Sequence, residues 1–572
     1  MGCVTGFEGE EALASAAVRL GATQVAGWSA AEQALADAAR TGSAAAGPGG
    51  PGGQAGAERI RQVSQLRQVR DQILAGEDPL GEEFCRLRSP ARRRPSGQTF
   101  TPGPVVRSMT GWAARRLTPA RVVDPGTGSA RFLIAAGRRW PRAALVGVET
   151  DPLAAMIGRA CLAAAGMAGR ASVTLGDYRS LDLPPVAGPT LFLGNPPYVR
   201  HHQIPAEWKD WLRSAAAGRG LAASGLAGMH VHFFLATALH AAPGDAGVLV
   251  TAAEWLDVNY GALVRSLLLG PLGGRSVHLL DPAVPAFADA AATTAITCFL
   301  PGSTPCSIRL RRVARPGDLG ELAGGTALPA RVLRAASRWT PLADGGAGPA
   351  GAAPLPAGPA HGTPLPTGQV ELGELCRVHR GQVTGANKVW VTAGSPGGLP
   401  GRFLFPAVTR ASELFRAQGT LATTSSLRFV IDLPADLAEL APDELAPVAR
   451  FLAQAEAAGA AGSYIARHRN PWWRVRLRAP APILASYMAR RPPAFVRNLA
   501  GARHVNIAHG LYPREQLPPA ALDGLAAFLR QSVSCGQGRT YAGGLTKFEP
   551  GEMERLPVPA PELLPAYAGS GR

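Results

Sequence analysis

The chain is poor in charged and aromatic side chains, and above all in lysine. Charged residues make up 17% of its 572 residues and aromatic residues 6%, whereas about 25% of a typical soluble domain is charged. Three of the 58 basic residues are lysines, Lys209, Lys388 and Lys547, so 55 are arginines. A GC-rich coding sequence explains the preference for arginine, but it does not explain the net charge of +17. An excess of that size indicates a polyanionic partner.

Cysteine is scarce as well. The seven cysteines form no C-x-x-C pair and no Cys/His cluster with zinc-ligand spacing, so we expect no metal site. The chain does not begin with the basic start and apolar stretch of a signal peptide. The longest uncharged apolar stretch, residues 221–242, holds three histidines and predicts a buried amphipathic helix rather than a membrane span. We therefore expect a cytoplasmic protein without a membrane partner.

Stretches rich in Gly, Ala and Pro divide the chain. Residues 41–57 and 341–368 have this composition, which is typical of linkers and cannot pack a core. No internal repeat is present. The expected parts are a helical N-terminal region at 1–96 that contains the linker 41–57, a catalytic domain at 97–312, a linker region at 313–368, a third domain at 369–560 and a tail at 561–572.

Short apolar runs alternate with helical stretches through the expected catalytic domain. Helices are expected at about 129–139 and after Pro152. Strands that alternate with helices predict an α/β fold with a mostly parallel sheet. The expected strands lie at 121–123, 144–148, 173–175, 190–193, 247–251, 277–280 and 295–300.

A glycine turn and an acid follow the first two expected strands. The first strand ends at Asp124, and the turn contains Gly126 and Gly128. Glycines let the backbone turn sharply and approach a ligand closely. The second strand ends at Glu149, about 20 residues later, where a carboxylate can accept hydrogen bonds from both hydroxyls of a ribose.

A third acid follows the third expected strand. Asp177 can accept a hydrogen bond from an adenine amine, and the ring of Tyr178 can lie against the base. The three acids fall at the carboxyl ends of successive strands, where open α/β sheets bind ligands. The turn lacks the third glycine of a dinucleotide fingerprint, which disfavours a nicotinamide cofactor.

The sequence Asn195-Pro196-Pro197-Tyr198 follows the fourth expected strand. The exocyclic amine of a purine is a poor nucleophile because its lone pair is delocalised into the ring. The side-chain carbonyl of Asn195 and the backbone carbonyl of Pro196 can accept hydrogen bonds from both N–H groups, and the two prolines fix the backbone between them. Tyr198 offers a ring on which an extruded base can stack, worth about 1–3 kcal/mol, against an unstacking cost of about a few kcal/mol. The pattern predicts methylation of an amine.

These motifs, preceded by Phe100-Thr101-Pro102, occur in the order of the gamma-class, TaqI-like adenine-specific DNA methyltransferases. The chain resembles this family over residues 97–300, and the segments 254–261 and 379–387 extend the resemblance. The resemblance implies a Rossmann-like class I sheet and S-adenosyl-L-methionine as cofactor. It also implies flipping of a duplex adenine and direct displacement at the sulfonium methyl group, with no covalent enzyme intermediate.

The resemblance also implies a role for each matched residue near the cofactor. Thr101 and Pro102 would pack on its methionine part. Asp124 and the two glycines after it would hold its amino-acid end, although many members of the class have Glu in place of this Asp. Glu149 would bind the ribose and Asp177 the adenine.

The remaining matched residues concern the target base. Asn195 and Pro196 would hold the target amine in this catalytic motif, and Tyr198 would stack on the base. Phe287, in an apolar run, resembles the second aromatic residue of the base pocket. Cys306 lies after the last expected strand, which disfavours the chemistry of a cytosine-carbon methyltransferase.

The third domain is predicted to recognise the DNA target. Residues 457–514 contain ten arginines and no acidic residue. Arg474, Arg476 and Arg478 alternate, so they would share one face of a strand. The arginine fork suits phosphates and guanine edges. The expected DNA contacts are Arg467, Arg469, Trp472, Trp473, Arg474, Arg476 and Arg478.

Several alternatives stay open from the sequence. The amine methylated can belong to RNA or to a protein glutamine, because N-P-P-Y does not separate these substrates. A non-catalytic DNA-specificity subunit of a defence system is a further alternative. A fused nuclease is disfavoured, because common nuclease cores need a catalytic lysine and the first one is Lys209. A separate restriction endonuclease or defence-system subunit stays open as a partner.

Overall fold

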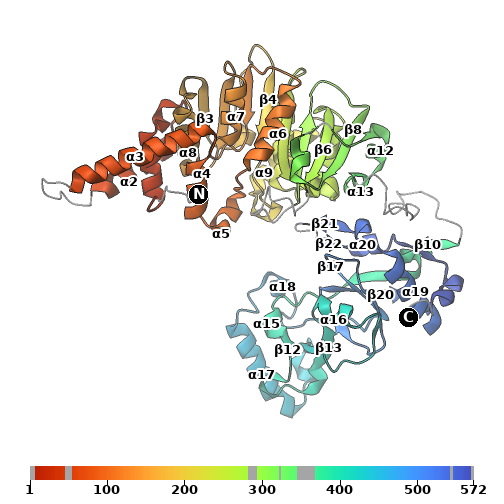
Figure 1. The fold of residues 1–572 in the computed structure, drawn as a ribbon. Coiled ribbons are helices and arrows are strands. Elements are labelled where there is room, and N and C mark those ends of the chain that lie inside the picture. Colours follow the sequence, from red (N-terminus) through yellow and green to blue (C-terminus); the bar gives the residue numbers. More distant parts are fainter. Residues whose placement is uncertain are drawn as a thin grey trace. The chain divides into compact units, whose positions relative to one another are not determined.

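A computed structural model describes most of the chain (Figure 1). The chain divides into two compact units, Met1–Gly351 and Ala352–Arg572. None of the helices in the described ranges is long and apolar enough to cross a bilayer. The described residues are 7–44, 54–280, 293–320, 322, 324–343, 368–541 and 545–568.

A nine-stranded sheet forms the centre of the first unit, in the order β3-β2-β1-β4-β5-β7-β6-β8-β9. The five strands from β3 to β5 are parallel, and β7 runs antiparallel to both β5 and β6. The predicted α/β fold is confirmed, and each of the seven expected strands is present. The strands are β1 (Arg121–Asp124), β2 (Ala144–Glu149), β3 (Ala171–Leu175), β4 (Thr190–Gly194), β5 (Ala246–Ala252), β6 (Gly274–Leu280), β7 (Thr294–Phe299), β8 (Ser307–Val313) and β9 (Thr326–Pro329).

Helices cover both faces of this sheet because the side chains of its strands are apolar on both faces. Successive residues point to opposite faces. Val122 thus belongs to the buried cluster that includes Trp112 of one helical layer, whereas Val123 belongs to the cluster that includes Phe233 of the other. The first layer is α6 (Gly103–Ala114), α7 (Arg131–Arg139) and α8 (Pro152–Ala164); the second is α9 (Ala206–Ala217), α10 (Met229–His240) and α11 (Ala262–Leu268).

The N-terminal helices pack on α8 through a buried apolar cluster (Figure 1). An ion pair between Arg159 and Glu32, both fully buried, lies in this contact, and the two side chains are 2.6 Å apart. Arg159 also donates hydrogen bonds to the carbonyls of Val25 and Gly27. Its guanidinium therefore holds the N-terminal region against the sheet. The helices are α1 (Glu10–Arg19), α2 (Ala30–Ala44), α3 (Gln54–Ala75) and α4 (Pro79–Leu87).

Four sequence expectations about segment boundaries are wrong. Helices α2 and α3 occupy both ends of the expected linker 41–57. The helix expected at 221–242 begins only at Met229. The expected linker 313–368 contains β9, α12 (Ala330–Ala335) and α13 (Thr340–Ala343), because Leu333 and Trp339 complete an apolar cluster. The expected tail contains a 3-10 helix, η15 (Pro561–Tyr567), whose Leu564 is buried.

The second unit is built from small sheets and two longer helices. A five-stranded sheet has the order β11-β20-β16-β18-β14, and a four-stranded sheet has the order β12-β15-β13-β19. The five-stranded sheet packs against α19 (Pro519–Ser532), whereas α17 (Pro442–Ala457) packs with the four-stranded sheet. Those strands are β11 (Cys376–Arg380), β12 (Val391–Thr392), β13 (Leu404–Val408), β14 (Thr420–Leu421), β15 (Arg428–Ile431), β16 (Ile483–Ser486), β18 (Phe495–Asn498), β19 (Arg503–His504) and β20 (Ala508–Pro513).

Candidate functional site

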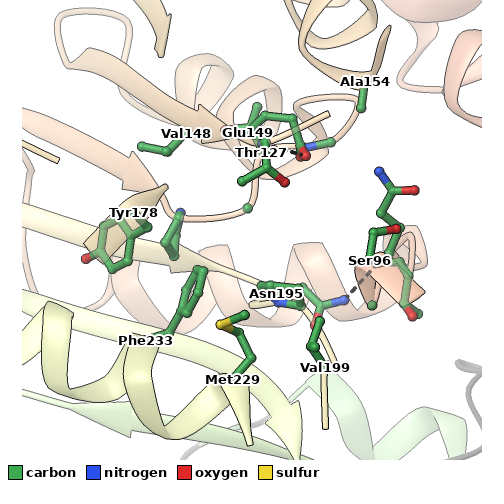
Figure 2. Close-up of a pocket in the computed structure, with 18 of the residues that line it drawn as sticks. Ser96, Thr127, Val148, Glu149, Ala154, Tyr178, Asn195, Val199, Met229 and Phe233 are labelled. Carbon is green, nitrogen blue, oxygen red and sulfur yellow. Dashed lines mark hydrogen bonds between the residues drawn. The ribbon is translucent and has the colours of Figure 1, made fainter. Parts of the chain in front are cut away.

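A cavity of about 250 Å³ lies where β1 to β4 end. Figure 2 shows Glu149 and Ala154 along one side of it and Asn195, Met229 and Phe233 along the other. The structure brings eight predicted site residues together in its wall. They are Thr101, Gly126, Gly128, Glu149, Asp177, Tyr178, Asn195 and Pro197. Four other predicted residues are chain neighbours of wall residues but do not line the cavity themselves. They are Pro102, Asp124, Pro196 and Tyr198.

The glycine turn after β1 is tight because other backbone segments approach it closely. Gly128 has a φ of 50°, and a Cβ at Gly158 of α8 would lie 2.6 Å from the Gly128 carbonyl oxygen. A Cβ at Gly147 of β2 would lie 2.3 Å from Oγ1 of Thr127. Small residues at these positions therefore let α8 and β2 close around the turn.

Glu149 is held in one orientation by backbone donors. Oε2 accepts a hydrogen bond from the N–H of Gly128 at 2.9 Å, while Oε1 accepts from Thr150 at 2.9 Å and Asp151 at 3.0 Å. Burial raises the pKa of Glu149, and these backbone donors oppose that rise. Oε2 keeps a lone-pair site for a further donor, so the group can accept a hydrogen bond from a ribose hydroxyl.

Asp124 is fully buried behind the turn. Oδ1 accepts a long hydrogen bond from Gly126, at 3.4 Å, and Oδ2 has no hydrogen-bond partner among the described residues. Burial is the main cause that raises the pKa of Asp124 to about 8, and the charge of Glu149 adds to it. An unpartnered buried carboxylate costs free energy, so the position suits a cationic ligand group such as an amino-acid ammonium.

The carboxylate of Asp177 accepts hydrogen bonds that the sequence did not indicate. Its Oδ1 accepts hydrogen bonds from the Arg179 backbone N–H at 2.9 Å and from Nε at 2.8 Å, and its Oδ2 accepts from Nη2 at 2.6 Å. The Arg179 guanidinium lies 3.8 Å from the ring centroid of Trp208. This bidentate pair fixes the carboxylate beside the cavity. The sequence analysis missed Arg179, although its spacing of two residues from Asp177 was visible.

The apolar side of the cavity comes from two helical segments. Tyr178 is buried, its hydroxyl lies 3.1 Å from Oγ1 of Thr237, and its ring centroid lies 5.3 Å from that of Phe233. Phe233 and Met229 of α10 also line the cavity. The sequence analysis missed both, because two apolar residues one turn apart on a helix have the same pattern as core positions.

The side-chain amide of Asn195 is held in one orientation through its nitrogen. Nδ2 donates hydrogen bonds to the carbonyl oxygen of Thr99 and to Oγ1 of Thr101, each at 3.0 Å. A carbonyl accepts but cannot donate, so the contact with Thr99 assigns the two ends of the amide. Oδ1 is buried and has no hydrogen-bond partner among the described residues. The site thus presents an oriented acceptor with no donor of its own.

The N-P-P-Y segment is held from behind by Gly97. The N–H of Tyr198 donates to the Gly97 carbonyl at 3.1 Å, and a Cβ at Gly97 would lie 2.5 Å from that nitrogen. Gly97 also has a φ of 66°. The Tyr198 hydroxyl is buried without a partner among the described residues, and burial raises the pKa of Tyr198. Phe287, the other predicted stacking residue, lies outside the described residues.

The predicted DNA contacts of the second unit separate into two groups. Arg469 donates to the backbone carbonyls of Val383 and Thr384, and the two tryptophans pack into an apolar cluster, so these three stabilise the fold. Arg467 is exposed. The strand expected at 474–478 is wrong, because Asp432 accepts hydrogen bonds from the N–H groups of residues 476 and 477 and takes the place of a neighbouring strand. Arg474, Arg476 and Arg478 nevertheless line one hollow together.

A second hollow adjoins this one, and arginines line both. Arg478 also lines the second hollow, together with Arg377, His379, Tyr512 and Arg514. Among the described residues that line the two hollows, Asp432 is the one acidic residue, and it accepts hydrogen bonds from backbone N–H groups. Within the described parts of the chain, no three His, Cys, Asp or Glu side chains are placed to hold a metal ion.

The sheet order, the cavity at the strand ends and the antiparallel β7 between β5 and β6 define a Rossmann-like class I methyltransferase fold. The chain belongs to the type II DNA methyltransferases. It is 50% identical over 489 residues to type II methyltransferase M.XamI of Xanthomonas campestris pv. amaranthicola, which covers 86% of this chain and 88% of the relative. Residues 367–568 match the C-terminal domain of type II methyltransferase M.Eco57I.

Two further similarities are more distant. The fold is similar to that of the type IIL restriction-modification enzyme MmeI in complex with DNA, with a TM-score of 0.55 and 12% identity, over 82% of this chain and 69% of that one. A tRNA (adenine-N6)-methyltransferase of Porphyromonas gingivalis is 30% identical over 103 residues, which covers 18% of this chain and 40% of that protein.

Proposed function

We propose that this protein methylates the N6 amine of adenine at a specific sequence in duplex DNA, with S-adenosyl-L-methionine as the methyl donor. The observation that carries the proposal is the buried, unpartnered Oδ1 of Asn195, whose amide is oriented by Thr99 and Thr101. An acceptor held in this way costs free energy until a donor arrives. The N–H of a target amine supplies that donor.

The chain's own residues act on the amine by holding it. Oδ1 of Asn195 accepts one N–H and the backbone carbonyl of Pro196 accepts the other, which favours the pyramidal nitrogen that a nucleophile needs. The acceptors are positioned before the substrate arrives, so little reorganisation accompanies the reaction. The described residues that line the cavity include no cysteine, in keeping with transfer that needs no covalent enzyme intermediate.

The cavity suits the proposed cofactor in charge and in shape. Glu149 would bind the ribose, Asp124 would attract the amino-acid ammonium from behind the glycine turn, and Tyr178 and Phe233 would lie together beside the adenine, near Asp177. When bound, the cofactor supplies an electrophilic methyl group on a sulfonium.

The second unit is proposed to bind the DNA target through its basic hollows. Arg474, Arg476 and Arg478 face one hollow, and arginine suits phosphates and guanine edges. Base flipping would deliver the adenine to Asn195 at a cost of about a few kcal/mol. A companion restriction endonuclease on another chain would complete a restriction-modification system.

An adenine in RNA is the second candidate substrate. The partial similarity to a tRNA (adenine-N6)-methyltransferase favours it. The basic second unit, which lies in the segment matched by a type II methyltransferase domain, favours DNA.

Long-read sequencing of modified DNA from a methylation-free host tests the proposal. Expression of the chain is expected to place N6-methyladenine at one recurring sequence, whereas an Asn195→Ala variant leaves the DNA unmodified. Methylation of cytosine, or of host RNA with all DNA adenines unmodified, would overturn it.

A further inference from the structure

Asp78 lies where the N-terminal helices meet the catalytic sheet. It is 9% exposed and caps α4, since Oδ1 accepts a hydrogen bond from the N–H of Gly81 at 2.9 Å. Its other oxygen, Oδ2, accepts hydrogen bonds from Oγ of Ser129 and Nε of Arg131. Ser129 and Arg131 follow the glycine turn and line the cofactor cavity, whereas Asp78 lines a separate hollow behind them.

The contacts continue from Arg131 to the proposed catalytic amide. Nη1 of Arg131 donates to the backbone carbonyl of Thr101 at 2.9 Å. Oγ1 of Thr101 in turn accepts the 3.0 Å hydrogen bond from Nδ2 of Asn195. Four residues therefore form one path, from Asp78 through Arg131 and the backbone and side chain of Thr101 to Asn195.

We infer that Asp78 is a positioning residue for methyl transfer, which acts through Arg131 and Thr101 on the direction of Oδ1 of Asn195. The inference rests on the proposed function of Asn195. Asp78 does not line the cavity, so it has no direct contact with the substrate or cofactor proposed to bind there. The N-terminal region thereby becomes part of the catalytic apparatus.

The charge of Asp78 is what this role needs. A hydrogen bond from an arginine to a carboxylate is stronger than one to a neutral amide, and it fixes the plane of the guanidinium that also holds Thr101. An Asp78→Asn substitution keeps an oxygen for the α4 cap but removes this charge. The Arg131 guanidinium is then free to turn toward the hollow, and the segment of Thr101 loses one support.

A double-mutant cycle separates positioning from general stability. Thr101→Val removes the hydroxyl that joins Thr101 to Asn195, so the path from Asp78 to Asn195 is broken at Thr101 and only the contact with the Thr99 carbonyl remains. We expect Asp78→Asn to lower kcat about 10- to 100-fold in the otherwise native protein. In the Thr101→Val background the further loss should be less than about twofold. Glu10→Gln, which removes a carboxylate from Arg88 at the other end of α4, is the matched control and should leave kcat unchanged.

Hydrogen exchange measured by mass spectrometry gives a second readout that needs no activity. The amides of residues 98–101 should exchange faster in Asp78→Asn than in Glu10→Gln. Equal losses of kcat in both backgrounds, or equal exchange in the two variants, would overturn the inference. If the native protein methylates no adenine at all while the exchange still differs between the variants, the fault lies with the proposed function instead.

Discussion

At the scale of the residue, the site combines groups that burial makes unfavourable without a ligand. Asp124 has an oxygen without a partner among the described residues, and so does Asn195. Both belong to motifs that the sequence predicted, because the residue types and their spacing are local. What the sequence could not predict is the state of each group. Burial and partner atoms depend on contacts between distant segments, such as the contact of Asn195 with Thr99.

The pKa of Asp124 leads to a prediction about stability. This pKa is raised from 3.8 to about 8, so the folded protein binds more protons than the unfolded chain between those values, and stability falls as pH rises through this window. Asp124→Asn removes the ionisable group. The melting temperature of the variant should therefore exceed that of the native protein by a margin that grows from pH 4 to pH 8, while its cofactor binding weakens. A margin that is constant with pH, measured by scanning calorimetry, would contradict the assignment.

At the scale of the element, long-range pairs attach the N-terminal helices to the sheet. Glu32 and Arg159 are 127 residues apart in sequence, so no local pattern predicted their contact. Seven of the nine strands in the sheet of the first unit, in contrast, could be predicted, because each contains a short apolar run; β8, which carries three arginines, and β9 were not predicted. The three arginines at 474–478 show both cases, since they line one hollow together but do not form the strand that was predicted for them.

The buried ion pair predicts a large effect of a small change. Glu32→Gln leaves the Arg159 guanidinium buried without its charge partner, which typically costs about 3–5 kcal/mol. The free energy of unfolding of the first unit, measured in denaturant, should fall by this amount. Arg40→Ala is the control on the same helix, because its pair with Asp37 is 68% and 51% exposed and such pairs contribute about 1 kcal/mol or less. Similar losses for both variants would show that Arg159 does not hold the region.

The basic hollows predict a specific change in salt dependence. Each phosphate contact contributes a slope of about −0.9 in log Kobs against log salt concentration. If Arg478 contacts one phosphate, Arg478→Ala should reduce the magnitude of the slope by about that amount in fluorescence-anisotropy titrations of duplex DNA. Arg450→Ala, an exposed arginine of α17 outside both hollows, should leave the slope unchanged. An unchanged slope for Arg478→Ala would remove Arg478 from the interface.

At the scale of the whole molecule, two compact units divide the work that the chain is proposed to do. The first carries the cavity, and the second carries the basic hollows. The sequence predicted a catalytic half and a basic half, because composition and motif order differ between them. It placed the end of the catalytic half too early, because the β9 to α13 segment joins the first unit through a few apolar residues such as Leu333 and Trp339.

The central claim is that the carbonyl of Asn195 holds the target amine, and single-turnover methyl transfer to duplex DNA tests it most directly. Asn195→Ala should lower the transfer rate by about 100-fold or more, a loss typical of removing one preorganised polar group. Cofactor affinity, measured by calorimetry, should change by less than about threefold, as expected for a group that acts on the reacting amine alone. A variant that transfers methyl groups at the native rate, or that loses activity only because the cofactor no longer binds, would contradict the claim.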